Sequence, residues 1–137
     1  ATSIVNNDQF NYSGGTLNAD IINNATGTVT LSGAGTRNVN GDVTNDGRFV
    51  VTGSGARYSG FFENNGAYVS TLSANEFASL FVGPDGYLVG GDGDLFFFGN
   101  DFMNYSVSDL WNTNMADLSF ADGGPHEFYL GMAGQNH

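Results

Sequence analysis

The sequence predicts an all-β fold, a parallel β-helix whose turns of about 20 residues stack into a solenoid. Two observations support this. A segment rich in glycine and asparagine recurs at a nearly constant interval, and the composition favours short strands joined by tight turns. The chain holds 21 Gly against 2 Pro, together with 12 Phe and 6 Tyr. Glycine and asparagine suit tight turns, whereas phenylalanine, tyrosine, valine and threonine suit strands.

The repeat covers residues 23–41, 44–60, 63–79 and 82–99, with a fainter first copy in residues 6–20. Each of the four clear copies contains one turn glycine, and a short strand of alternating character follows it, at 28–31, 48–51, 67–70 and 87–89. The turn glycines are spaced by 20, 19 and 20 residues: Gly27, Gly47, Gly66 and Gly86. A single coil of this length cannot bury its apolar face, but stacked coils share one continuous core.

Alternation along each strand places every second side chain in the predicted core. The predicted inward residues are Val29, Leu31, Phe49, Val51, Tyr68, Leu88 and Phe96. A β-sandwich or meander is the alternative, since its turns also recur every 8 to 12 residues or so. We favour the solenoid because the repeat keeps its phase through four copies.

The last segment, residues 100–137, breaks the pattern and holds the only Trp and both His. Solenoids end in atypical repeats that cover the exposed core. We therefore expect one domain, in which coils over residues 1–99 are closed by a cap over residues 100–137. Within it, 109–120 reads as a strand or a short helix and 126–132 as a strand. The predicted cap residues are Trp111, Phe120, His126 and Phe128.

The charge excludes several classes of partner. The chain has a formal charge of −11, no Lys and no Cys. Nucleic acids and anionic membranes require clustered cations, so neither is an expected partner. No apolar run reaches the length of a membrane span. The composition suits a secreted, extracellular bacterial protein.

Charge is also unevenly distributed along the chain. Residues 1–60 carry a net charge of −1, because four Asp face three Arg, and residues 61–137 carry −10, because ten acids face no base. If the coils follow chain order, one end of the solenoid is almost neutral and the other is strongly acidic. This polarity favours head-to-tail association over contacts between like ends.

Two candidate binding sites emerge. Acidic residues on glycine-rich turns suit Ca²⁺, which binds carboxylate and carbonyl oxygens. The candidate calcium ligands are Asp85, Asp92, Asp94 and Asp101, with solvated turn carboxylates as the alternative. Aromatic side chains would form a platform for sugar rings if they faced outward, with core packing as their default role: Tyr58, Phe61, Phe62, Tyr68 and Tyr87. No catalytic motif is present, and we expect no enzymatic activity.

The sequence resembles secreted bacterial β-helical proteins that carry a PEP-CTERM sorting signal and occur in exopolysaccharide-producing bacteria. The coils NNATGTVTLSGAG and NDGRFVVTGSG carry this resemblance, as does GNDFMNYSVSDLWNTNMADLSFADGGPHEFYLGMAG. In the last segment the similar positions are Phe102, Trp111, Ala116, Leu118, Phe120, Gly123, His126 and Phe128. The Pro-Glu-Pro motif and hydrophobic tail of such proteins are not in this sequence. The resemblance implies export and a structural part in a biofilm or cell surface.

We therefore expect an extracellular structural protein of a bacterial surface, biofilm matrix or filament, which self-associates head to tail through its solenoid ends. The alternative is a module that binds extracellular polysaccharide, with calcium as its candidate cofactor.

Overall fold

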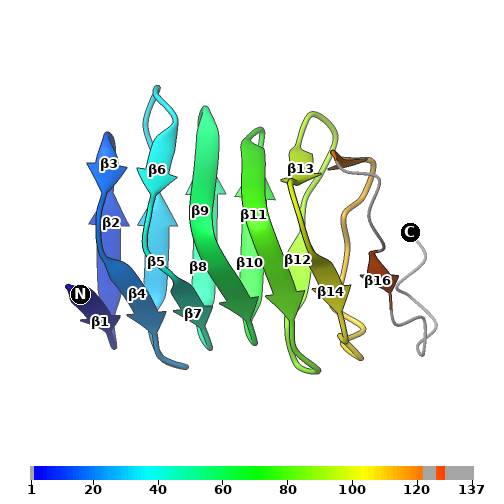
Figure 1. The fold of residues 1–137 in the computed structure, drawn as a ribbon, viewed down its shortest axis with the longest axis horizontal. Helices are drawn as coiled ribbons and strands as arrows, with labels where there is room; N and C mark the ends of the chain where they lie inside the picture. Colours follow the sequence, from blue (N-terminus) through cyan, green and yellow to red (C-terminus); the bar gives the residue numbers. More distant parts are fainter. Residues whose placement is uncertain (1, 122–125, 129–137) are drawn as a thin grey trace.

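The computed structural model describes residues 2–121 and 126–128. These residues contain sixteen strands and no helix, and hence no helix long and apolar enough to cross a membrane. The strands form an eleven-stranded and a five-stranded sheet in which every strand pair is parallel. The two sheets face each other along one long axis, with strands running across that axis (Figure 1). The predicted parallel β-solenoid is confirmed, with about six turns.

Each turn contributes strands to three parallel ladders. The back ladder is the five-stranded sheet: β2(Gln9–Tyr12), β5(Thr28–Leu31), β8(Arg48–Thr52), β10(Ala67–Thr71) and β12(Tyr87–Val89). The upper front ladder consists of β3(Thr16–Leu17), β6(Arg37–Val39), the first half of β9(Gly55–Asn64), the first half of β11(Ala74–Val82), β13(Leu95–Phe98) and β15(Asp117–Phe120). The lower front ladder consists of β1(Ser3–Asn6), β4(Asp20–Asn23), β7(Val43–Asn45), the second halves of β9 and β11, β14(Phe102–Asn104) and β16(Glu127–Phe128).

The predicted strands after the turn glycines are the strands of the back ladder. Equivalent positions in this ladder are 19 or 20 residues apart, as the aligned residues Phe10, Val29, Phe49, Tyr68 and Leu88 show. The faint first copy is a genuine coil, because β2 pairs with β5 in the same register.

The core lies between the two sheets. All seven residues predicted to face inward are fully buried. From Phe49 onward the interior is largely aromatic: the rings of Phe49 and Tyr68 stack with centroids 5.7 Å apart, and those of Tyr58 and Phe77 with centroids 5.0 Å apart. Stacked coils thus bury a continuous apolar column that no single coil could bury.

The turn glycines are required by close backbone approach rather than by an unusual φ. A Cβ at Gly66 would lie 2.2 Å from the carbonyl oxygen of Gly47, and a Cβ at Gly86 would lie 2.1 Å from that of Asn64. At Gly47 the nearest carbonyl oxygens would be 2.4 Å away, and at Gly27 a Cβ would meet both the Asn23 side chain and the Asn6 backbone. Any side chain at these positions would therefore force neighbouring coils apart.

Left-handed backbone occurs instead at the opposite corner, after the back ladder. Gly33 has a φ of +110° and Gly53 a φ of +86°, and the register places Leu72 at the position of Gly53 in the next coil. Leu72 adopts a φ of +50° although it is not glycine, and its side chain is 70% exposed. A bulky side chain in this region costs roughly 1–2 kcal/mol, whereas asparagine tolerates it.

We therefore predict that Leu72→Asn will raise the free energy of unfolding by about 1 kcal/mol, because it removes backbone strain and sacrifices little burial. Urea denaturation will measure the change. The matched control is Leu110→Asn, at an exposed leucine outside the positive-φ positions, which should change stability by less than about 0.5 kcal/mol. A loss of stability in the Leu72 variant would contradict this account.

The C-terminal segment continues the solenoid as well as closing it. β15 pairs with β13, β16 pairs with β14, and Val89 forms a bridge with Asn112, so all three ladders extend into it. Residues 109–120 contain the strand β15 and no helix. Of the predicted strand at 126–132, Glu127 and Phe128 form β16, and residues 129–132 lie outside the described part.

Candidate functional site

A ladder of buried asparagine side chains runs through the lower front of the solenoid. Asn6, Asn23, Asn45 and Asn64 occupy one register position in successive coils, and each is buried. The side-chain amide Nδ2 of each of the first three donates to the Oδ1 of the next asparagine, at 2.8, 2.7 and 2.7 Å along the series. Each Nδ2 also donates to a backbone carbonyl, such as that of Ala67 for Asn45, at 3.0 Å. The ladder therefore links four coils, and each of its amide-to-amide hydrogen bonds has its donor in one coil and its acceptor in the following coil.

The asparagine ladder has two different ends. In the next coil the position is taken by the buried Val82, so Asn64 donates only to the carbonyl of Tyr87, at 3.1 Å. At the other end, no described residue donates to the Oδ1 of Asn6, because Asn6 belongs to the first described coil. That oxygen is an open acceptor for a donor from a preceding coil.

The first described coil differs from the later coils in its pairing and its burial. Among the described residues, β1, β2 and β3 pair on one side only, and β1 lies at the end of the solenoid opposite β16 (Figure 1). The inward side chains of this first coil are half-buried, whereas their partners in the next coil are fully buried. The half-buried residues are Ile4, Phe10, Tyr12 and Leu17, and their partners are Ile21, Val29, Leu31 and Val39.

A chain of buried polar groups crosses the core. The hydroxyls of Tyr58 and Tyr68 are 3.0 Å apart, and the Tyr68 hydroxyl donates to Oδ1 of Asn75 at 2.7 Å. Nδ2 of Asn75 donates to Oγ of Ser70 at 2.8 Å, and that hydroxyl donates to Oδ1 of Asp94 at 2.6 Å. These side chains are all buried. The network joins strands β9, β10 and β11 to the turn before β13.

Arg37 lies near this network and is completely buried. Its guanidinium donates to the backbone carbonyls of Gly33 and Thr52, both at 2.8 Å, and to that of Gly35. Sequence reasoning did not separate it from the exposed Arg48 and Arg57, because arginine is rarely fully buried in a core. Because the side chains of Arg37 and Asp94 are both buried and hydrogen-bonded inside the solenoid, they contribute little to the charge at its surface.

Burial raises the pKa of Tyr58 far above its ordinary value, against a smaller lowering by the Tyr68 hydrogen bond and the Arg37 charge. The pKa of Tyr68 is also raised, mainly by burial and further by Tyr58 and Asp94. Both phenols are thus held protonated inside the core.

The four candidate calcium ligands are not brought together. Asp94 is buried, and its carboxylate accepts hydrogen bonds from Ser70, from the backbone N–H of Ser73 at 2.9 Å and from that of Gly91 at 2.7 Å. The other three are exposed on separate turns: Asp85, Asp92 and Asp101. Within the described residues, no group of three or more acidic or histidine side chains could hold a metal ion. Asp94 instead stabilises a turn through these hydrogen bonds, and the glycine-rich sequence around it does not indicate this role.

Three of the predicted cap residues pack at the C-terminal end of the core. Trp111 is buried, and Phe120 stacks on Phe98 with ring centroids 5.2 Å apart. The rings of His126 and Phe120 have centroids 4.6 Å apart. The backbone of Phe128 pairs with Asn104, and the Phe128 side chain and Gly123 lie outside the described part.

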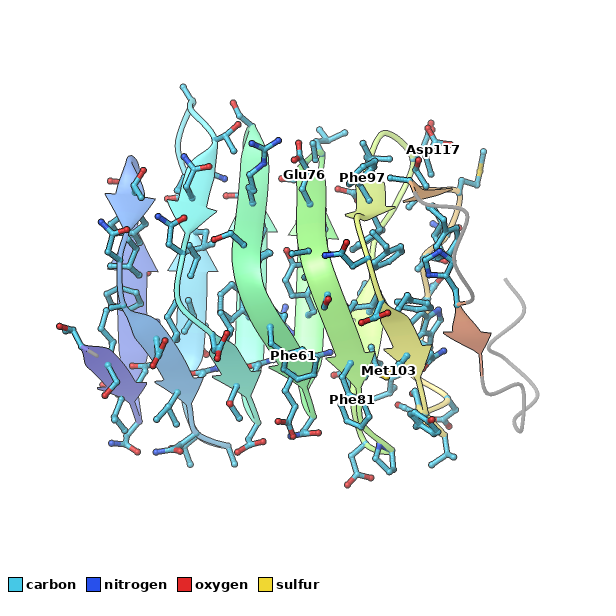
Figure 2. All side chains as sticks on the ribbon, viewed as in Figure 1. Phe61, Glu76, Phe81, Phe97, Met103 and Asp117 are labelled. Atoms are coloured by element: carbon cyan, nitrogen blue, oxygen red, sulfur yellow. The ribbon has the colours of Figure 1, made fainter. Side chains whose placement is uncertain are left out.

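Three of the five aromatic residues considered for a sugar platform take their default role, which is packing in the core. Tyr58, Phe62 and Tyr68 are buried, and only Phe61 and Tyr87 reach the surface. The front sheet nonetheless carries other outward apolar side chains, on strands β9, β11, β13 and β14 (Figure 2): Phe61, Phe81, Phe97 and Met103. The alternation within 95–98 identifies Phe97 as the outward residue once Phe96 is placed inside.

The asparagine ladder was not anticipated. The spacing from its members to the turn glycine varies, since Asn23 lies four residues before Gly27 whereas Asn45 lies two before Gly47. The neighbouring Asn24 is not a member of the ladder, because its side chain lies near the surface and donates to Asn7. Searches of protein-family models, curated proteins and solved structures gave no match to this chain, so its function is argued from the fold and these surfaces.

Proposed function

We propose that this chain is an extracellular structural protein of a bacterial surface, biofilm matrix or filament, and that it assembles head to tail through its solenoid ends. The open first coil carries the proposal. Among the residues that the structure describes, its three strands are unpaired on one side, and unpaired strand edges are templates for further strands. A second copy that placed its last coil against this edge would extend all three ladders in the same parallel sense.

Such a joint would bury what the first coil leaves exposed. The half-buried Phe10, Tyr12 and Leu17 would be covered as Val29, Leu31 and Val39 are covered inside the molecule. The Oδ1 of Asn6 would gain access to a donor. A heterologous contact of this kind leaves a new open edge on each added subunit and therefore generates a filament.

The charge distribution supports the same polarity. The N-terminal 60 residues are almost neutral, and the rest of the chain carries nearly all of the −11 charge. A neutral end against an acidic end repels less than two acidic ends do. Because the subunits still repel one another overall, we expect added salt to favour assembly by screening.

The edge strands offer a specific way to test the proposal. The carbonyl of Thr2 accepts a hydrogen bond from Asp20 in β4, and that of Asn6 accepts one from Asn24 just after β4. The intervening Val5 therefore directs its N–H to the unpaired side. The carbonyls of Asp8 and Tyr12 likewise face β5, which leaves the N–H of Asn11 open. Proline removes an N–H and is tolerated on an edge strand.

We expect the wild-type chain to sediment as oligomers that lengthen with protein concentration and salt, and to form filaments in negative-stain electron microscopy. The Val5→Pro/Asn11→Pro variant should remain folded, by circular dichroism, and monomeric. The matched control, Val5→Thr/Asn11→Thr, keeps both N–H groups and should still assemble. A monomeric wild type at every salt and concentration, or a proline variant that assembles as well as the control, would overturn the proposal.

A further inference from the structure

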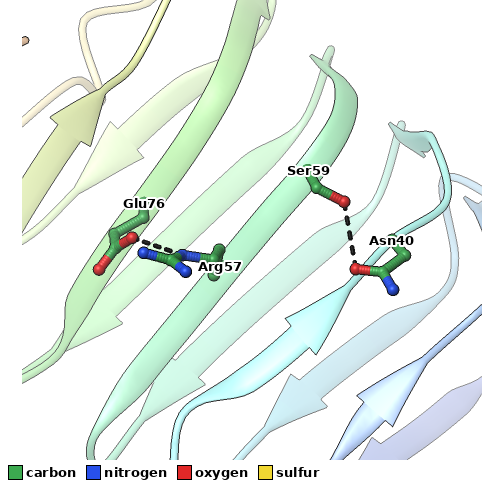
Figure 3. Close-up of polar contacts among 4 residues, drawn as sticks. All are labelled: Asn40, Arg57, Ser59 and Glu76. Atoms are coloured by element: carbon green, nitrogen blue, oxygen red, sulfur yellow. Dashed lines mark hydrogen bonds and ion pairs between the residues drawn. The ribbon is translucent and has the colours of Figure 1, made fainter.

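Two shallow hollows, of about 290 and 220 Å³, lie on the outer face of the front sheet, and we call them together the groove. Thr2, Asn18, Ala19, Asp20, Asn40 and Gly41 line the first hollow. Arg57, Ser59, Glu76, Ala78, Phe97 and Gly99 are prominent in the second. Asn40 lines the first hollow and Ser59 lines the second, and Oγ of Ser59 donates to Oδ1 of Asn40 at 3.1 Å (Figure 3).

The groove presents similar chemistry in successive coils. Asn18, Asn40 and Ser59 follow one another across the front sheet, and Nδ2 of Asn40 donates to Oδ1 of Asn18 at 2.7 Å. All three are exposed. Neighbouring strands lie about 4.8 Å apart, so an extended polymer lying along the groove would meet an amide or hydroxyl in each of these three coils.

The second hollow combines planar polar groups with an aromatic ring. Nε of Arg57 donates to Oε2 of Glu76 at 2.7 Å, and this pair lies on neighbouring strands (Figure 3). Phe97 follows Glu76 in the register of the next strand, on the same outer face (Figure 2). A half-buried ring beside a few placed polar groups is a usual way to bind a ligand that has both apolar and hydrogen-bonding surfaces. A sugar ring has this character, with C–H groups on its faces and hydroxyls at its rim.

The charges in the groove favour neutral saccharides over anionic ones. Arg57, the groove's only cation among the described residues, is paired with Glu76, and Asp20 adds a further negative charge. An anionic polysaccharide would be repelled by these groups and by the net charge of the chain. The amides and hydroxyls of Asn18, Asn40 and Ser59 are neutral and match uncharged hydroxyls.

We propose that a neutral polysaccharide binds along this groove, with Phe97 packed on a sugar ring and the Asn40–Ser59 and Arg57–Glu76 pairs hydrogen-bonded to its hydroxyls. This inference goes beyond assembly and does not depend on it, because the residues proposed to contact the sugar lie on the outward face of the front sheet and not on the unpaired strand edges. In a filament, grooves of successive subunits would form a longer site along the axis.

Isothermal titration calorimetry with cellohexaose, laminarihexaose and maltohexaose will test the proposal, with hexagalacturonate as the anionic comparison. We expect at least one neutral hexamer to bind and hexagalacturonate to bind more weakly. Phe97→Ala should weaken binding about tenfold through loss of the ring contact. Phe81→Ala, which removes an outward phenylalanine outside the groove, is the matched control and should bind as the wild type does.

Repeating the titration with the Val5→Pro/Asn11→Pro variant separates this proposal from the assembly proposal. Binding by the monomeric variant supports the groove whatever the wild type's oligomeric state. Failure of all three neutral hexamers to bind, stronger binding of hexagalacturonate, or equal losses in the Phe97 and Phe81 variants would overturn the groove.

Discussion

Asn45→Ala will lower the free energy of unfolding by roughly 3–4 kcal/mol, because the residue lies at the centre of the buried asparagine ladder. Its Nδ2 donates to Asn64 and to the carbonyl of Ala67, and its Oδ1 accepts from Asn23. Alanine leaves the Oδ1 of Asn64 without its ladder donor in a site that water does not reach. A buried acceptor without a donor costs about 1–3 kcal/mol, and the cavity adds to this.

The chain offers a closely matched control for this substitution. Asn40 also forms two side-chain bonds to neighbouring coils, to Asn18 and from Ser59, but it is exposed. Water can replace both partners, so Asn40→Ala should cost less than about 0.5 kcal/mol. Urea denaturation of both variants provides the comparison. Equal losses would show that burial does not set the value of these amide ladders.

The contrast between these two asparagines shows how far the sequence carries the fold. The 19- and 20-residue spacing of Gly27, Gly47, Gly66 and Gly86 was enough to predict the coils. Alternation then placed Val29, Phe49, Tyr68 and Leu88 inside. These predictions succeed because a parallel ladder imposes one register on every coil, and the register appears as a period.

Polar side chains inside the core do not follow from such a pattern. Asn23 and Asn24 are adjacent and chemically identical, yet one is buried in the ladder and the other lies at the surface. Their roles depend on the number of residues at the corner between a lower front strand and the back strand that follows it. This number varies from coil to coil. Arg37 and Asp94 are similar cases, because their burial depends on carbonyls and N–H groups supplied by neighbouring coils.

The sequence predicts a calcium site from acidic residues on glycine-rich turns. Such a pattern does not determine whether each carboxylate points into the core or out to the solvent. Asp92 and Asp94 are two residues apart in a glycine-rich turn, but Asp92 is exposed and Asp94 points into the core. The inward carboxylate is already bonded to Ser70 and to two backbone N–H groups. The aromatic residues of the C-terminal segment predict its capping role more successfully, although the same segment also adds a strand to each front ladder and a single bridge to the back ladder.

The wild-type chain will lose stability steeply above pH 10, and Tyr58→Phe will reduce the slope by about half. Burial raises the pKa of Tyr58 and of Tyr68 in the folded state, whereas in the unfolded chain each phenol has its ordinary pKa near 10. The stabilisation from these phenols is therefore complete below pH 10. Above it the unfolded state loses protons that the folded state retains, so the free energy of unfolding falls as pH rises.

Each retained proton costs up to about 1.4 kcal/mol per pH unit, so the two phenols together remove roughly 3–5 kcal/mol between pH 10 and 12. Tyr58→Phe removes one phenol and only its bond to Tyr68, while Tyr68 keeps its bond to Asn75. Urea denaturation at intervals from pH 8 to about pH 12 will give the slopes. Tyr87→Phe, on the outer face of β12, retains both buried phenols and serves as the control. Identical slopes for the wild type and the Tyr58 variant would mean that the core admits water to the phenols, which would contradict the closed aromatic interior.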